Sequence, residues 1–444
     1  MPKVSIIGAG GVVFPLTLIR DILSFAALRG STITLMDIDA ARLQHTHTGA
    51  RALIERFDLP TQLVATTDRR AALAGADYVI VCFQVGGLAA YQLDVEIPRR
   101  YGIDQCVGDT LGPGGVMRGL RSIPVLLSIA QDMQELCPNA LLIQYANPMA
   151  MNSWALNTTG IRNVGLCHSV QGTSQLLARR VGVPYEQVSF RSAGINHQAW
   201  FIEFRHGDED LYPRIREVMA QRYGRAPSHA AADNGDHSQP KGDSLYEGGS
   251  ERVRTAIMRT FGYFHTESSH HASEYVPYFR KNPELVREYI PERWDYFELC
   301  LAHEPPNYEK MLAQGLTPSH EYGAFIIDSM ETGTARVIYG NVENRGLITN
   351  LPAGCCVEVA CLVDSNGVQP TVVGDLPPQL AALNRACIAV QERAVHAAIH
   401  GDRAAVYQAI ALDPLTAALL TLDQIHSMTD ELLAAEAQWL PALR

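Results

Sequence analysis

The chain has 444 residues, of which 47% are hydrophobic and 19% charged, so it is long enough for two domains with substantial cores. Its formal net charge of -11 repels polyanions, which argues against nucleic-acid binding. The N-terminus lacks the pattern of a signal peptide, no run of about 18 apolar residues occurs, and the nine cysteines are never spaced C-x-x-C. We therefore expect a cytoplasmic protein with reduced core thiols and no membrane partner.

Short β-rich runs alternate with helix-like segments over the first 170 residues, which is the pattern of parallel βαβ units. Strands are predicted at Lys3 to Ile7, Thr32 to Met36, Leu63 to Thr66, Tyr78 to Cys82, Ala140 to Gln144 and Asn163 to Cys167. Six such strands predict an α/β fold with a Rossmann-type doubly wound parallel sheet, whose ligand lies at the carboxyl edge. The residues expected at that edge are Gly8, Asp37, Phe83, Tyr145 and His168.

Near residue 194 the sequence changes to aromatic- and charge-rich segments. This change predicts a dinucleotide-binding domain over residues 1–193 and an α+β substrate-binding and oligomerisation domain over residues 194–444. A polar stretch at 224–249 is too long for a tight connection and is expected to be a loop or lid. The last third is predicted to contain a helix at 322–330, strands at 335–342 and 355–363, and Ala/Leu-rich helices from Gln379 onward.

A glycine-rich segment, "SIIGAGGVVFP", follows the first predicted strand and precedes an expected helix from Leu16 to Leu28. Gly8, Gly10 and Gly11 would let backbone amides approach a pyrophosphate closely, although Val13 replaces the third glycine of the usual motif. The second strand ends at Asp37, whose carboxylate would bind a ribose diol and disfavour a 2'-phosphate. NAD is therefore the expected cofactor, and a plain strand-turn-helix is the alternative.

The segment "GLCHSV" places Cys167 directly before His168, and "AGINHQAW" supplies His197 thirty residues later. A thiolate and an imidazole could hold one divalent ion such as Mn²⁺ with positions open for substrate. The alternatives are a buried structural cysteine and a Cys-His nucleophile. If Cys167 faces a metal at a strand end, His168 should lie on another wall of the pocket as a general acid.

The segment "RTFGYFHTESSHHASEYVPYF" gathers three tyrosines, two glutamates and three histidines. Several of these are credible bases, and a polar aromatic surface loop is the alternative. Together the motifs resemble glycoside hydrolase family 4, the NAD- and metal-dependent glycosidases on a lactate/malate dehydrogenase-like fold. The resemblance rests on "IIGAGG", "VGDTLGPGGVMRGLRSIP", "YANPM", "GLCHSV", "GINH", "FGYFHTESSHHASEY" and "GLITNLPAG".

The resemblance implies site roles for individual residues. Cys167 and His197 would be the metal ligands, and His168 would be the general acid. Phe83 would contact the cofactor, Asn147 would bind substrate hydroxyls at the nicotinamide, and Asp109 would contact substrate. The base would come from the segment that contains Tyr263 and Glu267, and both stay candidates.

The implied reaction is oxidation at C3 of the sugar, loss of the C2 proton, elimination of the aglycone, addition of water and reduction. "CHSV" is similar to the branch that acts on unphosphorylated α-galactosides, and relatives form homodimers or homotetramers. An α-glucosidase, an α-hexuronidase with Arg118 or Arg121 as the carboxylate clamp, a 2-hydroxy acid dehydrogenase and a non-catalytic NAD sensor are the alternatives.

Overall fold

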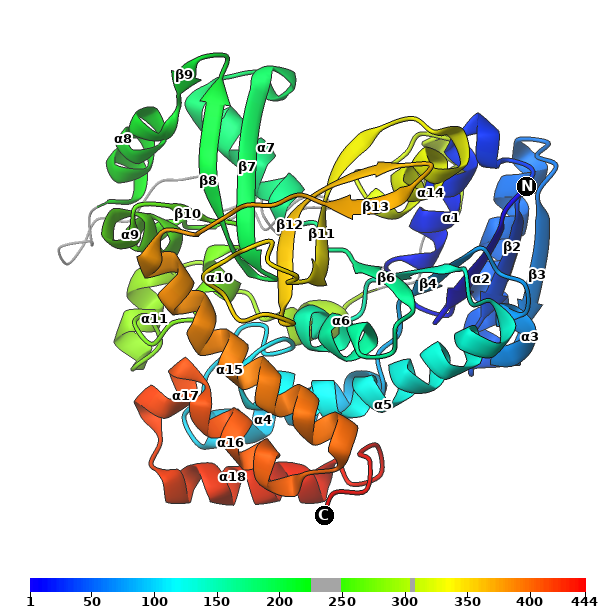
Figure 1. Ribbon diagram of the computed structural model, residues 1–444. Coiled ribbons are helices and arrows are strands. Elements are labelled where there is room, and N and C mark those ends of the chain that lie inside the picture. The colour runs from blue at the N-terminus through cyan, green and yellow to red at the C-terminus, as the bar shows by residue number, and fades with distance from the viewer. Residues whose placement is uncertain (225–248, 304–307) are drawn as a thin grey trace.

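The computed structural model describes residues 1–224, 249–303 and 308–444. Its strands join one 13-stranded sheet in these residues, with the order β10-β8-β7-β12-β11-β6-β5-β4-β1-β2-β3, β13 pairing with β12 and β9 with β8 (Figure 1). The strands are β1 Lys3–Ile7, β2 Thr32–Met36, β3 Gln62–Thr66, β4 Tyr78–Val81, β5 Leu141–Gln144, β6 Arg162–Gly165, β7 Val188–Ile195, β8 Gln198–His206, β9 Glu209–Asp210, β10 Phe264–His265, β11 Arg336–Glu343, β12 Cys356–Asp364 and β13 Gly367–Pro370.

Helices surround the sheet, and the longest of them, α5 and α15, cross beneath it in Figure 1. None of the described helices is long and apolar enough to cross a membrane. The α-helices are α1 Pro15–Ser24, α2 Ala40–Arg56, α3 Arg69–Leu73, α4 Gly87–Arg100, α5 Gly112–Leu136, α6 Met149–Asn157, α7 Ser169–Val181, α8 Tyr212–Tyr223, α9 Arg252–Phe261, α10 Ser269–Ala272, α11 Pro283–Tyr289, α12 Tyr296–Leu301, α13 Tyr308–Ala313, α14 Tyr322–Thr332, α15 Pro378–His400, α16 Arg403–Leu412, α17 Pro414–Leu419 and α18 Leu422–Ala435.

The first six strands pair in parallel in the order β3-β2-β1-β4-β5-β6. This is the Rossmann strand order, so the expected fold class is confirmed for this half of the molecule. Strands buried on both faces send alternate side chains into two cores. In β4, for example, Ile80 joins one hydrophobic cluster while Val79 and Val81 join the other.

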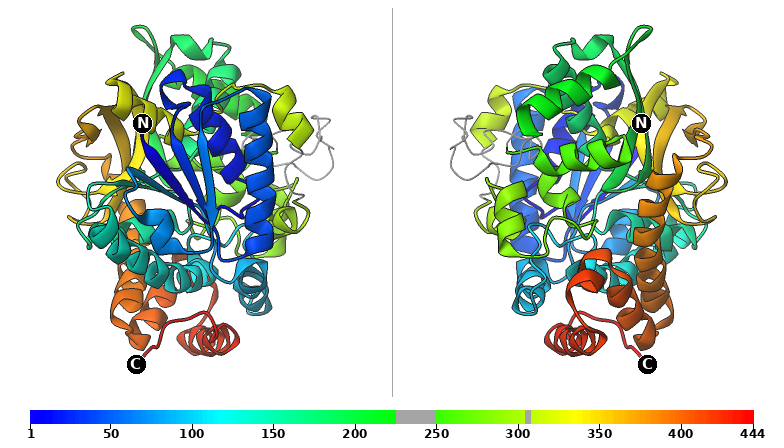
Figure 2. Two further views of the ribbon diagram at one scale, coloured as in Figure 1. Left: turned by 90° about the vertical axis from the view of Figure 1, so that its right-hand side faces the viewer. Right: turned by 90° about the vertical axis from the view of Figure 1, so that its left-hand side faces the viewer.

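Beyond β6 the sheet continues with strands from the second half of the chain. β6 pairs antiparallel with β11, β11 with β12, and β12 with β7, which then forms a hairpin with β8. The expected boundary between residues 193 and 194 falls inside β7, so the two expected regions share one sheet. Helices α15 to α18 pack near α4 and α5, at the end of the molecule away from the β8–β9 hairpin (Figures 1 and 2).

Two expected elements differ from the structure. The helix expected from Leu16 to Leu28 ends at Ser24, because Phe25 is extended with φ -81° and ψ 121°, and a short 3₁₀ turn, Ala26–Leu28, follows. The strand expected to reach Cys167 ends at Gly165, so Cys167 and His168 lie in the loop before α7. The remaining predicted strands agree within one residue, and all nine cysteines are free. The polar stretch at 224–249 lies outside the described residues except for its two ends.

Candidate active site

The glycine turn after β1 packs closely against the residues that follow the neighbouring strands. Gly8 has φ +89°, and a Cβ there would lie 2.8 Å from Cβ of Phe83, so a side chain at this position would collide with the wall of the turn. The Gly11 amide donates to the Gly8 carbonyl at 3.1 Å. The Gly10 amide donates to Oδ2 of Asp37 at 2.8 Å. The turn and the acid are therefore held together at the carboxyl edge, as dinucleotide binding requires.

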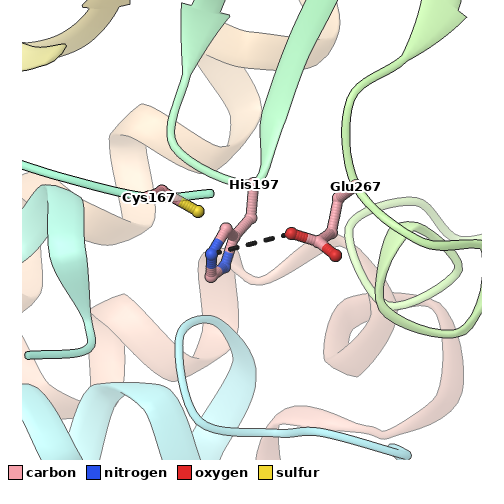
Figure 3. A group of neighbouring side chains, drawn as sticks. All are labelled: Cys167, His197 and Glu267. Carbon is pink, nitrogen blue, oxygen red and sulfur yellow. Dashed lines mark ion pairs between the residues drawn. The ribbon is translucent and has the colours of Figure 1, made fainter. Parts of the chain in front are cut away.

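Three possible metal ligands from three separate segments converge at the same edge (Figure 3). The ligand atoms of Cys167, His197 and Glu267 all lie within 4.8 Å of one another. Nε2 of His197 is 3.7 Å from Oε2 of Glu267. Burial, and next the nearby carboxylate of Glu358, raises the pKa of the Cys167 thiol to about 12. A divalent cation would reverse that balance, because a coordinated thiol loses its proton. Sulfur, imidazole and carboxylate donors suit a divalent metal ion of borderline softness, and three such ligands leave coordination positions open for substrate.

His197 occupies an unusual backbone position. Asn196 and His197 form the two-residue turn between β7 and β8, and His197 has φ +60°. A residue other than glycine in this left-handed region carries a local cost, and such residues cluster at functional sites. The turn projects the imidazole toward Cys167 and Glu267 (Figure 3).

His168 lines the same pocket as the cluster. Its Nδ1 is 3.2 Å from Oε1 of Glu321, the residue before α14. Burial lowers the pKa of His168, but the hydrogen bond and charge of Glu321 outweigh it and raise the pKa to about 10. The imidazole is therefore a cation at neutral pH, the form that can give up a proton.

Asp109 and Asn147 also line this pocket. The Asn147 amide donates to Oδ2 of Asp109 at 2.9 Å, and Nη1 of Arg118 lies 3.3 Å from the same oxygen. Burial would raise the pKa of Asp109, but the charge of Arg118 lowers it below its ordinary value. The result is a fixed carboxylate that orients the Asn147 amide.

These residues line one pocket, and no Lys or Arg of the described residues is among them. The lining residues are Phe14, Val107, Asp109, Tyr145, Asn147, Met149, Leu166, Cys167, His168, His197, Glu267, Ser268, His271, Trp294 and Tyr296. Tyr263 does not line it; its ring packs against Tyr212 at a centroid distance of 5.8 Å. The structure thus brings together the predicted metal, acid and substrate residues and Glu267, but leaves Tyr263 outside.

Sequence reasoning did not assign the roles of several residues that complete the site. His271 contacts the ring of His197 and is itself in contact with Glu274, and Glu321 contacts the ring of His168. The spacing of His271 and Glu274, three residues apart, was a usable signal because such residues are neighbours on a helical turn. Glu321 gave no comparable signal, because its partner is 153 residues away.

A parallel sheet with a pocket of ionisable groups at its carboxyl edge defines a Rossmann-type α/β enzyme. Residues 3–183 match the model of the family 4 glycosyl hydrolases, and residues 192–416 match the model of their C-terminal domain. The chain belongs to this family and is a glycosidase.

Curated relatives match over the full length. The chain is 41% identical to an alpha-galactosidase of Bacillus subtilis (strain 168), over 99% of both chains. It is 36% identical to an alpha-galactosidase of Rhizobium meliloti (strain 1021), over 99% of this chain and 89% of the relative.

Solved structures agree with the fold. The crystal structure of lplD from Bacillus subtilis has a TM-score of 0.84 at 28% identity and covers 98% of this chain and 100% of that one. A 6-phospho-alpha-glucosidase from gut microorganisms, in complex with NAD and Mn²⁺, has a TM-score of 0.79 at 20% identity over 100% of both chains. A malate dehydrogenase from Plasmodium falciparum has a TM-score of 0.52 at 12% identity over 90% of this chain and 99% of that one. The last comparison confirms the dehydrogenase-like fold.

Proposed function

We propose that the protein is an α-galactosidase that hydrolyses unphosphorylated α-galactosides and depends on NAD⁺ and Mn²⁺. The pocket carries this proposal, because Cys167, His197 and Glu267 converge beside a cationic His168 while no described Lys or Arg lines the walls. A substrate phosphate or carboxylate is commonly bound by an Arg or Lys side chain, and the described walls offer neither. The names of the two relatives agree with this specificity.

The residues present fit both cofactors. The Gly8 to Gly11 turn leaves no room for a side chain at Gly8 and would hold the pyrophosphate, with Asp37 on the adenosine ribose and Phe83 at the wall. Cys167 and His197 would hold the metal. When bound, NAD⁺ would accept a hydride from C3 of the sugar and Mn²⁺ would polarise the C2 and C3 oxygens.

The chain's own residues would move the protons and orient the sugar. His168 would protonate the glycosidic oxygen as the aglycone leaves. Asn147, fixed by Asp109, would position the sugar hydroxyls. Glu267 would take the C2 proton, although its 3.7 Å separation from His197 also suits a metal ligand. Glu267→Gln separates the two roles: loss of C2 proton exchange with unchanged Mn²⁺ affinity supports the base, and a weakened affinity supports the ligand.

An α-hexuronidase is a less suitable function for this pocket. Arg121 is fully buried, and its guanidinium pairs with Asp94 and Glu436, so it is not available to a substrate. Arg118 faces Asp109 and the ring of Tyr91. Neither arginine is placed as a carboxylate clamp in the described pocket.

A panel of α- and β-linked p-nitrophenyl glycosides, assayed with NAD⁺, Mn²⁺ and a thiol reductant, tests the proposal. We expect turnover of the α-galactoside that requires both cofactors and leaves no net NADH. Preference for an α-glucoside or an α-galacturonide would overturn the specificity, and NADH accumulating with substrate would indicate a dehydrogenase. A cytoplasmic homodimer or homotetramer is part of the proposal, and light scattering after size exclusion measures that state.

A further inference from the structure

A chain of buried side chains runs from His197 through His271, which also lines the pocket, to Glu274. Nδ1 of His197 lies 2.9 Å from Nε2 of His271, and Nδ1 of His271 lies 3.1 Å from Oε2 of Glu274. The three residues are 7%, 3% and 1% exposed, respectively. Because Nε2 of His197 faces Glu267, the contact with His271 uses the ring nitrogen on the far side from the metal cluster.

Glu274 has a fixed role as the hydrogen-bond acceptor at the end of this chain. Its carboxylate accepts from the backbone amides of Cys106, Val107 and Gly108 at 2.6, 2.8 and 3.1 Å. Burial would raise its pKa, but the hydrogen bond from His271, the charge of Arg280 with Nη2 3.9 Å from Oε1, and the Val107 amide lower it below the ordinary value. An ionised carboxylate has no proton to donate, so the ring nitrogen of His271 that faces Glu274 must carry one.

The direction of each hydrogen bond then follows along the chain. A neutral His271 with its proton on Nδ1 has a free lone pair on Nε2, and this nitrogen can only accept. Its partner, Nδ1 of His197, must therefore be the donor. With the proton of His197 on Nδ1, Nε2 keeps the lone pair that a metal ion requires. Oδ1 of Asp109 does not compete for Nε2 of His271, because the two atoms are 4.0 Å apart.

We infer that His271 and Glu274 are positioning residues that fix the metal-binding tautomer of His197. The inference rests on the proposed metal site. A metal-ligating histidine commonly donates its second N–H directly to a carboxylate or carbonyl, and here a second histidine stands between the ligand and the carboxylate. Loss of His271 would leave His197 free to take the other tautomer and to rotate on its turn.

The chain offers a matched control for this inference. His270 is the neighbour of His271 on α10 and is also buried, but its ring stacks on Trp294 and its Nε2 lies 3.0 Å from the Glu292 carbonyl. Mn²⁺ affinity, measured from the electron paramagnetic resonance signal of free Mn²⁺, should fall about 10- to 100-fold in His271→Phe and stay close to wild type in His270→Phe. Equal affinity of His271→Phe and wild type, or an equal loss in both variants, would overturn the inference.

A second measurement needs no metal. In ¹⁵N-histidine spectra of the metal-free protein, with His197 assigned from its variant, we expect the His197 proton on Nδ1 in wild type and a mixture of tautomers in His271→Phe. A wild-type His197 protonated on Nε2 would refute the inference. If wild type binds no Mn²⁺, the proposed metal site fails, while the tautomer spectrum still decides whether His271 orients His197.

Discussion

Replacing Glu321 tests how the proposed acid stays charged. In Glu321→Gln the side chain keeps its size but loses the charge that raises the pKa of His168 to about 10. Burial is then opposed only by the weaker effects of Cys167 and Glu267, and the pKa should fall toward the ordinary histidine value of about 6.5. The protonated fraction at about pH 8 would drop from about 99% to about 3%, a loss of about 30-fold, but at about pH 6 the loss would be under about two-fold. Because the His168 side chain is 42% exposed, solvent screens part of the interaction, and the 30-fold loss is an upper value.

The assay is the pH dependence of kcat/KM with an α-galactoside of an alkyl alcohol, whose leaving group needs a proton more than nitrophenolate does. We expect the alkaline limb of the profile to move to lower pH in Glu321→Gln. The control is the same substitution in a His168→Gln background, where it should have no further effect. An unmoved alkaline limb, or the same change in both backgrounds, would refute the assignment of His168 as the acid that Glu321 controls.

Three further predictions concern the scaffold and the cofactor turn. Arg121→Ala should lower the free energy of unfolding in urea by about 3 to 5 kcal/mol, because Asp94 and Glu436 would stay buried without their cation. Gly8→Ala should abolish measurable NAD⁺ binding by calorimetry, because a Cβ would collide with the turn wall at φ +89°. Burial raises the pKa of Asp413 to about 6 from 3.8, so wild type should lose up to about 3 kcal/mol relative to Asp413→Asn as pH rises from about 4 to about 6. A constant stability difference between the two proteins across that range would contradict the Asp413 prediction.

The parallel half of the fold was predictable because its signals are local. Each strand is a short apolar run that ends in glycine, a polar residue or an aromatic residue, and the helices between the strands are long enough for crossovers. The rest of the sheet depends on distant pairs, such as Gly165 with Asn341 and Glu358 with Gly194. No short-range pattern encodes such pairs, so the shared sheet could not be foreseen.

The same contrast between local signals and distant pairs applies to the site. Cys167 and His197 were identified from motifs, and the structure brings them together. The loop position of Cys167 was missed because the predicted strand was two residues too long, and Glu321 was missed as the partner of His168 because α14 lies far along the chain. His271 and Glu274 belong to a segment rich in candidate bases, but only the structure shows which of its histidines contacts His197.

The strand order also has a consequence for how the protein is made. Strands β11 and β12 lie between β6 and β7, although they follow both in the chain. On a ribosome the first six strands could pair soon after they emerge, whereas β7 and β8 have no edge to join until residues 336–364 have been translated. Cys167 and His197, thirty residues apart, are thus fixed relative to each other only late in synthesis. A nascent chain should therefore be able to acquire its nucleotide turn well before it can capture a metal ion.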